Sequence, residues 1–455
     1  MKEGLPVTET KGLMTEGVIW KKILLFSIPL LLGNVFQQLY NTVDSVVVGN
    51  YIGGNALAAV GTSGPIINLL VGFFMGLATG AGVVIARYFG ARDEKGVHDA
   101  VHTTLATTVL GGLFLMVAGV ALSPLLLRLI GTPEDILPDS ITYLRIYFGG
   151  IIAMMIYNMG AGILRAVGDS KTPLYFLIIS SIVNIVLDLL FVIVFEMGVA
   201  GVAWATLCAQ VVSATLTIIT LCRVKASYRV NLKDIRIQLS YLKEIIRIGL
   251  PSGLQNSIVS LSNIVVQSYI NSFGSAAIAG YSTYGKVDAF ALMPVMSLSM
   301  AITTFTSQNI GAQNYHRVRK GVKTGLCMTC GTAVVLTTGV IIFARVLLGI
   351  FTGDQEIIEY GLLTMTYQAP FYVVLAINNT LAGILRGAGK ASVPSFIMAA
   401  NMCGLRIIWL SVMMPLFHSI IVVYLAFSVT WVTTCLCLIF YYKRSHWLEH
   451  LELSH

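Results

Sequence analysis

The chain has 455 residues, of which 56% are hydrophobic and only 11% are charged, and its mean hydropathy is +0.82. This composition lies far outside the range of soluble globular domains and indicates a membrane protein. The net charge of +8 does not indicate a nucleic-acid-binding protein, because the basic residues are placed as expected for residues that mark one side of a bilayer.

Apolar runs of about 20 residues or more recur along the chain, and each is long enough to cross a bilayer as a helix. The first is too long and too rich in Gln and Asn for a signal peptide. Clusters of Lys and Arg follow every second run, so the positive-inside rule predicts that both termini are cytoplasmic. The runs predict twelve transmembrane helices, at about 23–48, 56–86, 101–124, 139–164, 172–195, 199–222, 244–270, 277–305, 322–349, 359–385, 392–416 and 420–442.

The two halves of the chain resemble each other when they are shifted by about 221 residues. AGILRAVGDSKTP at 161–173 then matches AGILRGAGKASVP at 382–394. We therefore predict an all-α polytopic membrane protein with two six-helix lobes, related by a pseudo-two-fold axis along the membrane normal. The expected segments are a cytoplasmic tail at 1–19, an N-lobe at 20–222, a cytoplasmic linker at 223–243, a C-lobe at 244–442 and a cytoplasmic tail at 443–455.

This two-lobed plan is typical of a secondary transporter that alternates between inward-open and outward-open states. The sequence has no GxxxxGK[ST] loop for ATP and no TVGYG-like filter of a potassium channel. No soluble segment is long enough to carry enzyme chemistry, so we expect a transporter that needs no cofactor.

Polar residues interrupt three apolar runs of the first half at a similar depth, about 10 Å inside the outer surface. Asp44 lies in the first run, Asn184 and Asp188 lie four residues apart on one face of the fifth, and Thr206 lies in the sixth. The second half has apolar residues at the matching positions, namely Val265 or Val266, Leu405, Trp409 and Phe427.

A carboxylate at membrane depth costs a few kcal/mol and calls for a partner or a function. No Lys or Arg of the first half lies at the depth of Asp44 and Asp188. Carboxylate, amide and hydroxyl oxygens suit Na+, whereas two close carboxylates also favour binding of a proton, so H+ and Na+ both stay open. A structural alternative is that Asp44 hydrogen-bonds within the bundle and that Asp188 is satisfied separately. Pro29, in the same run as Asp44, permits a kink that would couple protonation of Asp44 to the shape of the cavity.

These residues and motifs resemble the multidrug and toxic compound extrusion (MATE) family of cation-coupled efflux transporters, over about residues 20–443. The most specific features are NTVDSVVVGN in the first run, FGARDE with its echo IGAQNY, and the repeated ILR motif. The resemblance is to the prokaryotic branch coupled through the N-lobe, the DinF-like branch. It implies a cation site at Asp44, Asn184, Asp188 and Thr206 and a substrate cavity at Gln37, Tyr143 and Asn158. A further cavity Asn of the family falls on Ala161 here.

The second half carries its own charged residues at membrane depth, Lys286, Asp288 and Arg406. Asp288 has two open interpretations, either an ion pair with Arg406 or a position in the substrate cavity that attracts cations. Met293 and its neighbours follow Asp288 in the eighth run, and flexible thioethers suit a promiscuous binding wall, although Met at helical spacing also suits plain packing.

We therefore expect a multidrug efflux antiporter of a bacterial or archaeal inner membrane. It would export cationic or amphipathic organic compounds in exchange for H+ or Na+ by rocker-switch alternating access. We expect membrane lipids around a monomer and no nucleic acid as a partner. The alternatives are a lipid-linked oligosaccharide flippase of the same superfamily and, in another class, a channel or a non-transporting receptor.

Overall fold

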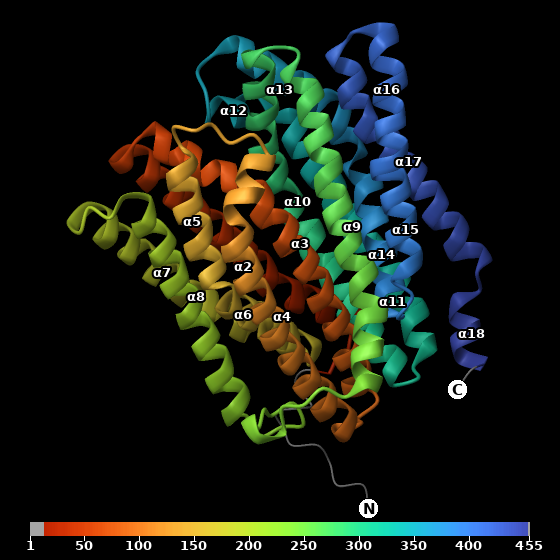
Figure 1. Cartoon of the computed structure of the whole chain (residues 1–455). Coiled ribbons are helices and arrows are strands. Elements are labelled where there is room, and N and C mark those ends of the chain that lie inside the picture. Colours follow the sequence, from red (N-terminus) through yellow and green to blue (C-terminus); the bar gives the residue numbers. More distant parts are fainter. Residues whose placement is uncertain (1–12, 454–455) are drawn as a thin grey trace, which may run out of the picture. The chain divides into compact units, whose positions relative to one another are not determined.

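The computed structural model describes residues 13–453, and these residues form helices joined by short connections, without a strand (Figure 1). The chain divides into two compact units. The first comprises Met1–Leu13 and Ile28–Gly249, and the second comprises Met14–Ser27 and Leu250–His455. Most of the predicted tail at 1–19 lies outside the described residues.

The first unit is a bundle of long helices with π-helical or 3-10 turns at three points. Its elements are α2 (Ile19–Val47, from Ile28 on), η1 (Val48–Ile52), α3 (Gly54–Gly90), α4 (Glu94–Leu129), α5 (Leu137–Gly149), α6 (Ile151–Ala166), α7 (Lys171–Leu189), η2 (Leu190–Val194), α8 (Gly198–Arg223) and η3 (Leu232–Asp234). The π turns η1 and η2 directly follow the helices that carry Asp44 and Asp188.

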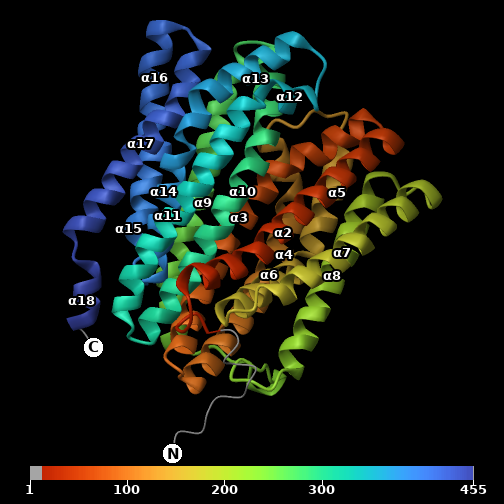
Figure 2. The same ribbon diagram turned by 180° about the vertical axis from the view of Figure 1, so that it is seen from behind.

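The second unit repeats this pattern with more breaks (Figure 2). Its elements are α9 (Leu239–Asn271, from Leu250 on), α10 (Ser275–Gly311), α11 (Tyr315–Ile342), α12 (Ala344–Gly349), α13 (Gln355–Gln368), η4 (Ala369–Phe371), α14 (Tyr372–Gly387), α15 (Ser392–Ala399), η5 (Ala400–Leu405), α16 (Arg406–Phe417), α17 (Ile420–Arg444) and α18 (Trp447–Leu453).

The internal repeat extends to backbone detail. Helices α3 and α10 both have 37 residues, and α6 and α14 both have 16. Asp93 caps α4 by accepting from the Gly96 N–H, and Asn314 caps α11 by accepting from the Arg317 N–H. Each cap follows a residue with a positive φ, Arg92 in the first half and Gln313 in the second. Both halves therefore make the same turn with different side chains.

Ten of the described helices are long and apolar enough to cross a membrane, and the bent pair α5–α6, with an angle of 49°, gives an eleventh. The predicted helix that fails this test is the seventh, at 244–270. It corresponds to α9, which is 33 residues long but carries Gln255, Asn256 and several serines. Length and apolar composition alone therefore support ten or eleven of the twelve.

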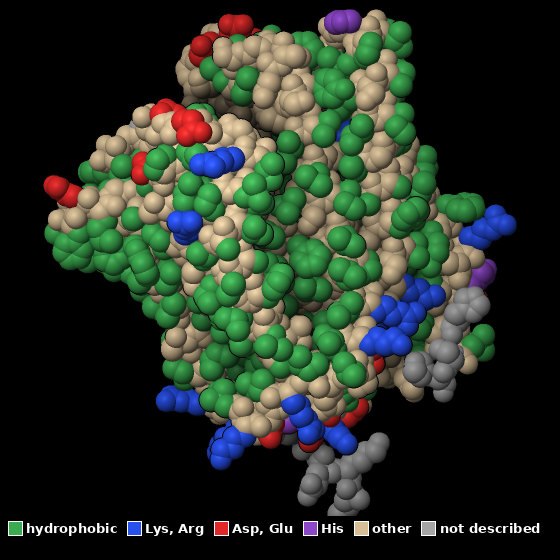
Figure 3. All heavy atoms as spheres, in the orientation of Figure 1, with side chains coloured by type: hydrophobic (Ala, Val, Ile, Leu, Met, Phe, Trp, Pro, Cys, Tyr) green, Lys and Arg blue, Asp and Glu red, His purple; other side chains and the backbone are tan. Residues whose placement is uncertain are grey.

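The outer surface of the first unit is apolar, as expected for helices that face lipid rather than water. Leu110, Phe114 and Val117 lie at helical spacing on α4 and are all exposed. Hydrophobic side chains cover the flank of this unit in Figure 3, and most of its Lys and Arg side chains gather at one end. The chain is thus an all-α, multi-pass membrane protein.

Small residues let the helices of the first unit approach closely. Gly119 on α4 faces the ring of Phe148 on α5, and a Cβ at this glycine would lie 2.3 Å from that ring. Phe148 and its neighbours Leu127, Leu144 and Ile151 form a buried apolar cluster. This packing holds α5, which carries Tyr143 and Tyr147, against α4.

Candidate functional site

Three helices of the first unit carry the four residues predicted to bind a cation. Asp44 lies on α2, Asn184 and Asp188 lie one helical turn apart on α7, and Thr206 lies on α8. Asn184, Asp188 and Thr206 are 1%, 0% and 8% exposed, and Asp44 is partly buried. The second unit carries Leu405, Trp409 and Phe427 at the matching positions of the last three residues, so the polar set belongs to one unit only.

The carboxyl groups of Asp44 and Asp188 lie within range of direct interaction with each other. Within the described part of the chain, no side chain or backbone N–H donates a hydrogen bond to either oxygen of Asp188 or to the buried Oδ1 of Asp44. The ion pairs found among the described residues also leave both aspartates without a Lys or Arg partner. Buried carboxylate oxygens are costly unless something satisfies them, so this pair is suited to share a proton or a cation.

Asn184 and Thr206 line a pocket with about 280 Å³ of non-atom space. Ser181 lies one turn before Asn184 and Gln210 lies one turn after Thr206, and both line the same pocket. Among the described residues, no partner reaches the side-chain oxygens of Asn184, Thr206, Ser181 or Gln210. The pocket therefore presents oxygen atoms of the kind that hard cations prefer.

Ser181 and Gln210 are functional candidates that the sequence analysis missed. The signal was present, because each lies three or four residues from a predicted residue on the same helix face.

Tyrosines surround the acid pair. Tyr40 on α2 hydrogen-bonds with Gln37 and lies near both aspartates, and Tyr143 on α5 also lies near Asp44 and Asp188. The Tyr143 ring stacks with Tyr147 at a centroid distance of 6.4 Å. The structure thus places the predicted cavity residues Gln37 and Tyr143 beside the acids, whereas Tyr40 and Tyr147 were not predicted.

Asn158, the third predicted cavity residue, lies on α6 in a different setting. Its Nδ2 donates to the Met154 carbonyl oxygen at 2.9 Å, and it lines a pocket of about 250 Å³. The other walls of this pocket are Val71, Phe74, Met75, Ala78, Met154, Met155 and Met159.

A third pocket, of about 250 Å³, lies between these two along the same helices. It shares Thr206 and Gln210 with the oxygen-lined pocket and Met154 with the methionine-lined pocket. In the first unit, the third pocket therefore connects the oxygen-lined pocket to the methionine-lined pocket through shared lining residues.

Asp288 and Met293 lie in the second unit, on α10. Asp288 accepts a hydrogen bond from the Tyr284 hydroxyl at 3.2 Å, and that hydroxyl lies 3.1 Å from the hydroxyl of Tyr372. Met293 is partly buried and does not line any of the three pockets described above.

The ion pair predicted between Asp288 and Arg406 is wrong for the described residues. Arg406 instead donates from Nη1 to Asn263 Oδ1 at 3.2 Å and from Nη2 to Thr430 Oγ1 at 3.3 Å. Its guanidinium lies 4.2 Å from the centroid of the Phe427 ring. Neutral oxygens and an aromatic face therefore contact this buried cation in place of a carboxylate, and its Nε has no partner among the described residues.

The duplicated helical fold and the carboxylates without a described partner in one half are features typical of a membrane transporter. The MatE family model matches residues 29–190 and again residues 251–412, one match in each half. Two relatives from Bacillus subtilis (strain 168) are named "Probable multidrug resistance protein". YoeA is 32% identical over 399 residues, with 86% of each chain covered. YpnP is 31% identical over 381 residues, with 82% of this chain and 84% of the relative covered. The chain therefore belongs to the MATE family of transporters and is not an enzyme.

Solved structures agree with this fold. A MATE protein in the "bent conformation" superposes with a TM-score of 0.91 at 22% identity, covering 99% of this chain and all of the other. A MOP superfamily transporter from Pyrococcus furiosus superposes with a TM-score of 0.90, also at 22% identity, covering 98% of this chain and all of the other. The architecture is thus that of the MATE fold.

Proposed function

We propose that this protein is a secondary active multidrug efflux antiporter of the DinF-like branch, coupled through the first unit. It exports cationic or amphipathic organic compounds in exchange for H+ or Na+. The observation that carries the proposal is the direct interaction of Asp44 with Asp188 in one unit, since Asp188 is buried, Asp44 is partly buried and no described Lys or Arg pairs with them. Membership of the MATE family and the names of the Bacillus relatives support the efflux role.

The proposed topology is that of a monomer in the inner membrane with both termini in the cytoplasm. It has twelve spans, in which α9 completes the second lobe despite its polar residues, because the equivalent helix of the first half, α2, passes the test of length and apolar composition. The two lobes, 20–222 and 244–442, would be related by a pseudo-two-fold axis along the membrane normal and would alternate access by a rocker-switch motion.

Coupling in this proposal depends on charge repulsion between the two aspartates. When a proton or Na+ is bound, one of the two negative charges of the pair is compensated, and the cation is shared between the two carboxylates. When the cation leaves, two negative charges at short range repel each other. These helices can bend at three points. Two are the π turns η1 and η2, each of which follows a helix that carries one of the acids, and the third is Pro29 within α2.

Asn184 and Thr206 complete the coupling site in this proposal. Both line the oxygen-rich pocket next to the acids, and their side-chain oxygens have no other described partner. If Na+ is the coupling ion, Asp44, Asn184, Asp188 and Thr206 are its ligands. If H+ is the coupling ion, the amide and hydroxyl groups are hydrogen-bond partners for the protonated acid.

The substrate cavity is proposed to follow the shared pockets of the first unit, with Gln37, Tyr143 and Asn158 on its walls. Four methionines line or adjoin the pocket of Asn158, and flexible thioethers adapt to ligands of different shape. The tyrosine faces near the acids suit organic cations. Asp288 and Met293 are the proposed contribution of the second lobe.

The test uses everted membrane vesicles with a fluorescent organic cation in the outside medium. An imposed pH gradient or Na+ gradient should drive accumulation of the dye in vesicles with the wild-type protein, and the ion that does so is the coupling ion. Transport that responds to neither gradient would overturn the antiport proposal. Movement of a lipid-linked oligosaccharide in the same vesicles would instead identify the flippase.

A further inference from the structure

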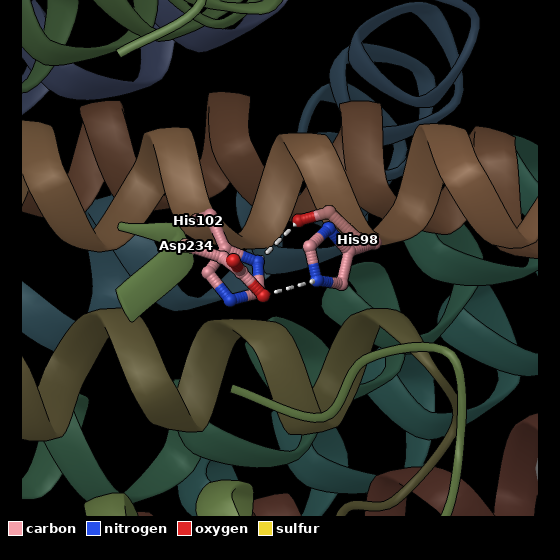
Figure 4. Close-up of side chains that lie close together, drawn as sticks. All are labelled: His98, His102 and Asp234. Atoms are coloured by element: carbon pink, nitrogen blue, oxygen red, sulfur yellow. Dashed lines mark hydrogen bonds and ion pairs between the residues drawn. The ribbon is translucent and has the colours of Figure 1, made fainter. Parts of the chain in front are cut away.

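Two histidines and an aspartate meet at the end of the first unit, outside the carboxylate site (Figure 4). His98 and His102 lie one turn apart on α4, and Asp234 ends the short helix η3 in the segment after α8. One ligand-type atom from each of the three side chains lies within 4.8 Å of the others. Among the described residues, this is the one group of three or more His, Cys, Asp or Glu side chains with such spacing.

The hydrogen bonds of His102 fix its tautomer. Its Nδ1 lies 2.7 Å from the carbonyl oxygen of His98, which only accepts, so Nδ1 carries the proton. Its Nε2 accepts from the backbone N–H of Asn231 at 3.0 Å, so Nε2 carries the lone pair. His102 is 1% exposed, and its ligand nitrogen is therefore held in one orientation.

His98 lies between two carboxylates. Its Nε2 is 3.6 Å from Asp234 Oδ2, and its Nδ1 is 3.6 Å from Oδ1 of the buried Asp99. A carboxylate behind the distal nitrogen is the arrangement by which metal-binding histidines are oriented and made more basic. Each histidine thus has an oxygen atom near its Nδ1, the Asp99 carboxylate for His98 and the His98 carbonyl for His102. The Nε2 atoms of both histidines lie close to Asp234.

Asn231 marks where a cation would bind. Its backbone N–H points at His102 Nε2, and its side-chain Nδ2 donates to Asp234 Oδ2 at 3.1 Å. These are two of the three lone pairs that a metal ion would use. The only described cation close to the carboxylates is Arg236, which is 3.9 Å from Asp99 and largely exposed, so a divalent ion would not meet a buried positive charge.

We propose that His98 Nε2, His102 Nε2 and Asp234 Oδ2 bind a divalent transition-metal ion of the zinc type, with water in the fourth position. Asp99 and the His98 carbonyl hold the histidines from behind. Ligand atoms of a tetrahedral zinc site are about 3.3 Å apart for bonds of about 2.0 Å, so the distances within the cluster must shorten by up to about 1.5 Å. The ion displaces both N–H groups of Asn231 and ties the segment after α8 to α4.

The experiment titrates zinc into the purified full-length protein in detergent, with a chromophoric chelator as competitor. We expect one zinc ion per chain. His98→Gln and His102→Gln should each weaken the affinity more than tenfold, and Asp99→Asn, which alters only the outer shell, by about tenfold. His316→Gln, at an exposed histidine on α11, is the matched control and should not change it.

Hydrogen exchange distinguishes a metal site from the alternative that these side chains only hold the segment after α8 against α4 by hydrogen bonds. Zinc should increase exchange at the Asn231 amide, because that N–H loses its acceptor, while the thermal unfolding temperature rises. Absence of stoichiometric zinc binding by a folded wild-type protein would overturn the proposal. Unchanged affinity in both folded histidine variants would overturn it as well.

Discussion

Asp44 on α2 and Asp188 on α7 bring their carboxyl groups into direct interaction, although 143 residues separate them in the chain. Neither has a Lys or Arg partner among the described ion pairs. Two negative charges in this position repel each other unless a cation lies with them. The electrostatic state of the pair therefore depends on what is bound, and this dependence is the physical basis of the first prediction.

Asp44→Asn should abolish gradient-driven export while the protein still folds. The amide keeps the shape of the side chain but removes the charge that binds the coupling cation. We expect at least a tenfold loss of dye accumulation in everted vesicles, which corresponds to about 1.4 kcal/mol of lost coupling. Asp139→Asn, at an exposed acid of the same unit, is the control. Normal export by Asp44→Asn would exclude the proposed role of this residue.

Thr206→Val should reduce transport without reducing stability. The hydroxyl of Thr206 is buried and has no described partner, so its removal relieves an unsatisfied polar group and is expected to raise the free energy of unfolding slightly, by about 1 kcal/mol. The same change removes a proposed oxygen ligand. Transport assays and thermal unfolding in detergent should therefore move in opposite directions.

The conservative variant Thr206→Ser retains the oxygen and should retain transport. If Thr206→Val is less stable than the wild type, the hydroxyl has a structural role. In that case its loss of transport says nothing about cation binding.

The double variant Asp288→Asn, Arg406→Leu should show additive effects on stability. Asp288 is held by Tyr284, and Arg406 by Asn263, Thr430 and Phe427, so the two charges share no contact among these bonds. Independent sites add within about 0.5 kcal/mol, and unfolding of the two single variants and the double variant measures this directly. A coupling energy well above this value would show that Asp288 and Arg406 do interact, as an ion pair requires.

Asp288→Asn also tests the substrate role proposed for this residue. If Asp288 attracts cationic substrates, the variant should lower transport of cations more than transport of neutral compounds. An equal loss for both substrate classes would leave only the structural role, in which the carboxylate accepts a hydrogen bond from Tyr284.

Gly119→Ala should destabilise the first unit. The added Cβ would lie 2.3 Å from the Phe148 ring, so α4 and α5 must move apart or the ring must leave its rotamer, at a cost of about 1–3 kcal/mol. Gly149→Ala is the matched control, because nothing lies within 4 Å of the Cβ it would add. Thermal unfolding of both variants in detergent gives the comparison, and equal stability would show that the helices adjust freely.

The sequence singled out candidate coupling residues because the two halves serve as controls for each other. A polar residue in one half opposite an apolar residue in the other, as with Asp188 and Trp409, separates special side chains from the common scaffold. Depth along a helix follows from residue number, so the sequence also predicted that Asp44, Asp188 and Thr206 lie at one level.

What the sequence did not predict depends on rotation about the helix axis and on neighbours from other helices. Asp288 and Arg406 were matched by depth, but depth does not say which way a side chain points. Tyr40 lies near both aspartates and Tyr147 lies beside Tyr143, and these positions depend on how several helices pack together.

The repeated turn before α4 and α11 bears on the history of the chain. Arg92 and Asp93 in one half and Gln313 and Asn314 in the other adopt the same backbone geometry and the same cap, although none of the side chains is identical. The common scaffold was therefore present before the gene duplicated and has outlasted changes of sequence. The acid pair exists in one copy only, so it was gained by one descendant half or lost by the other after that event.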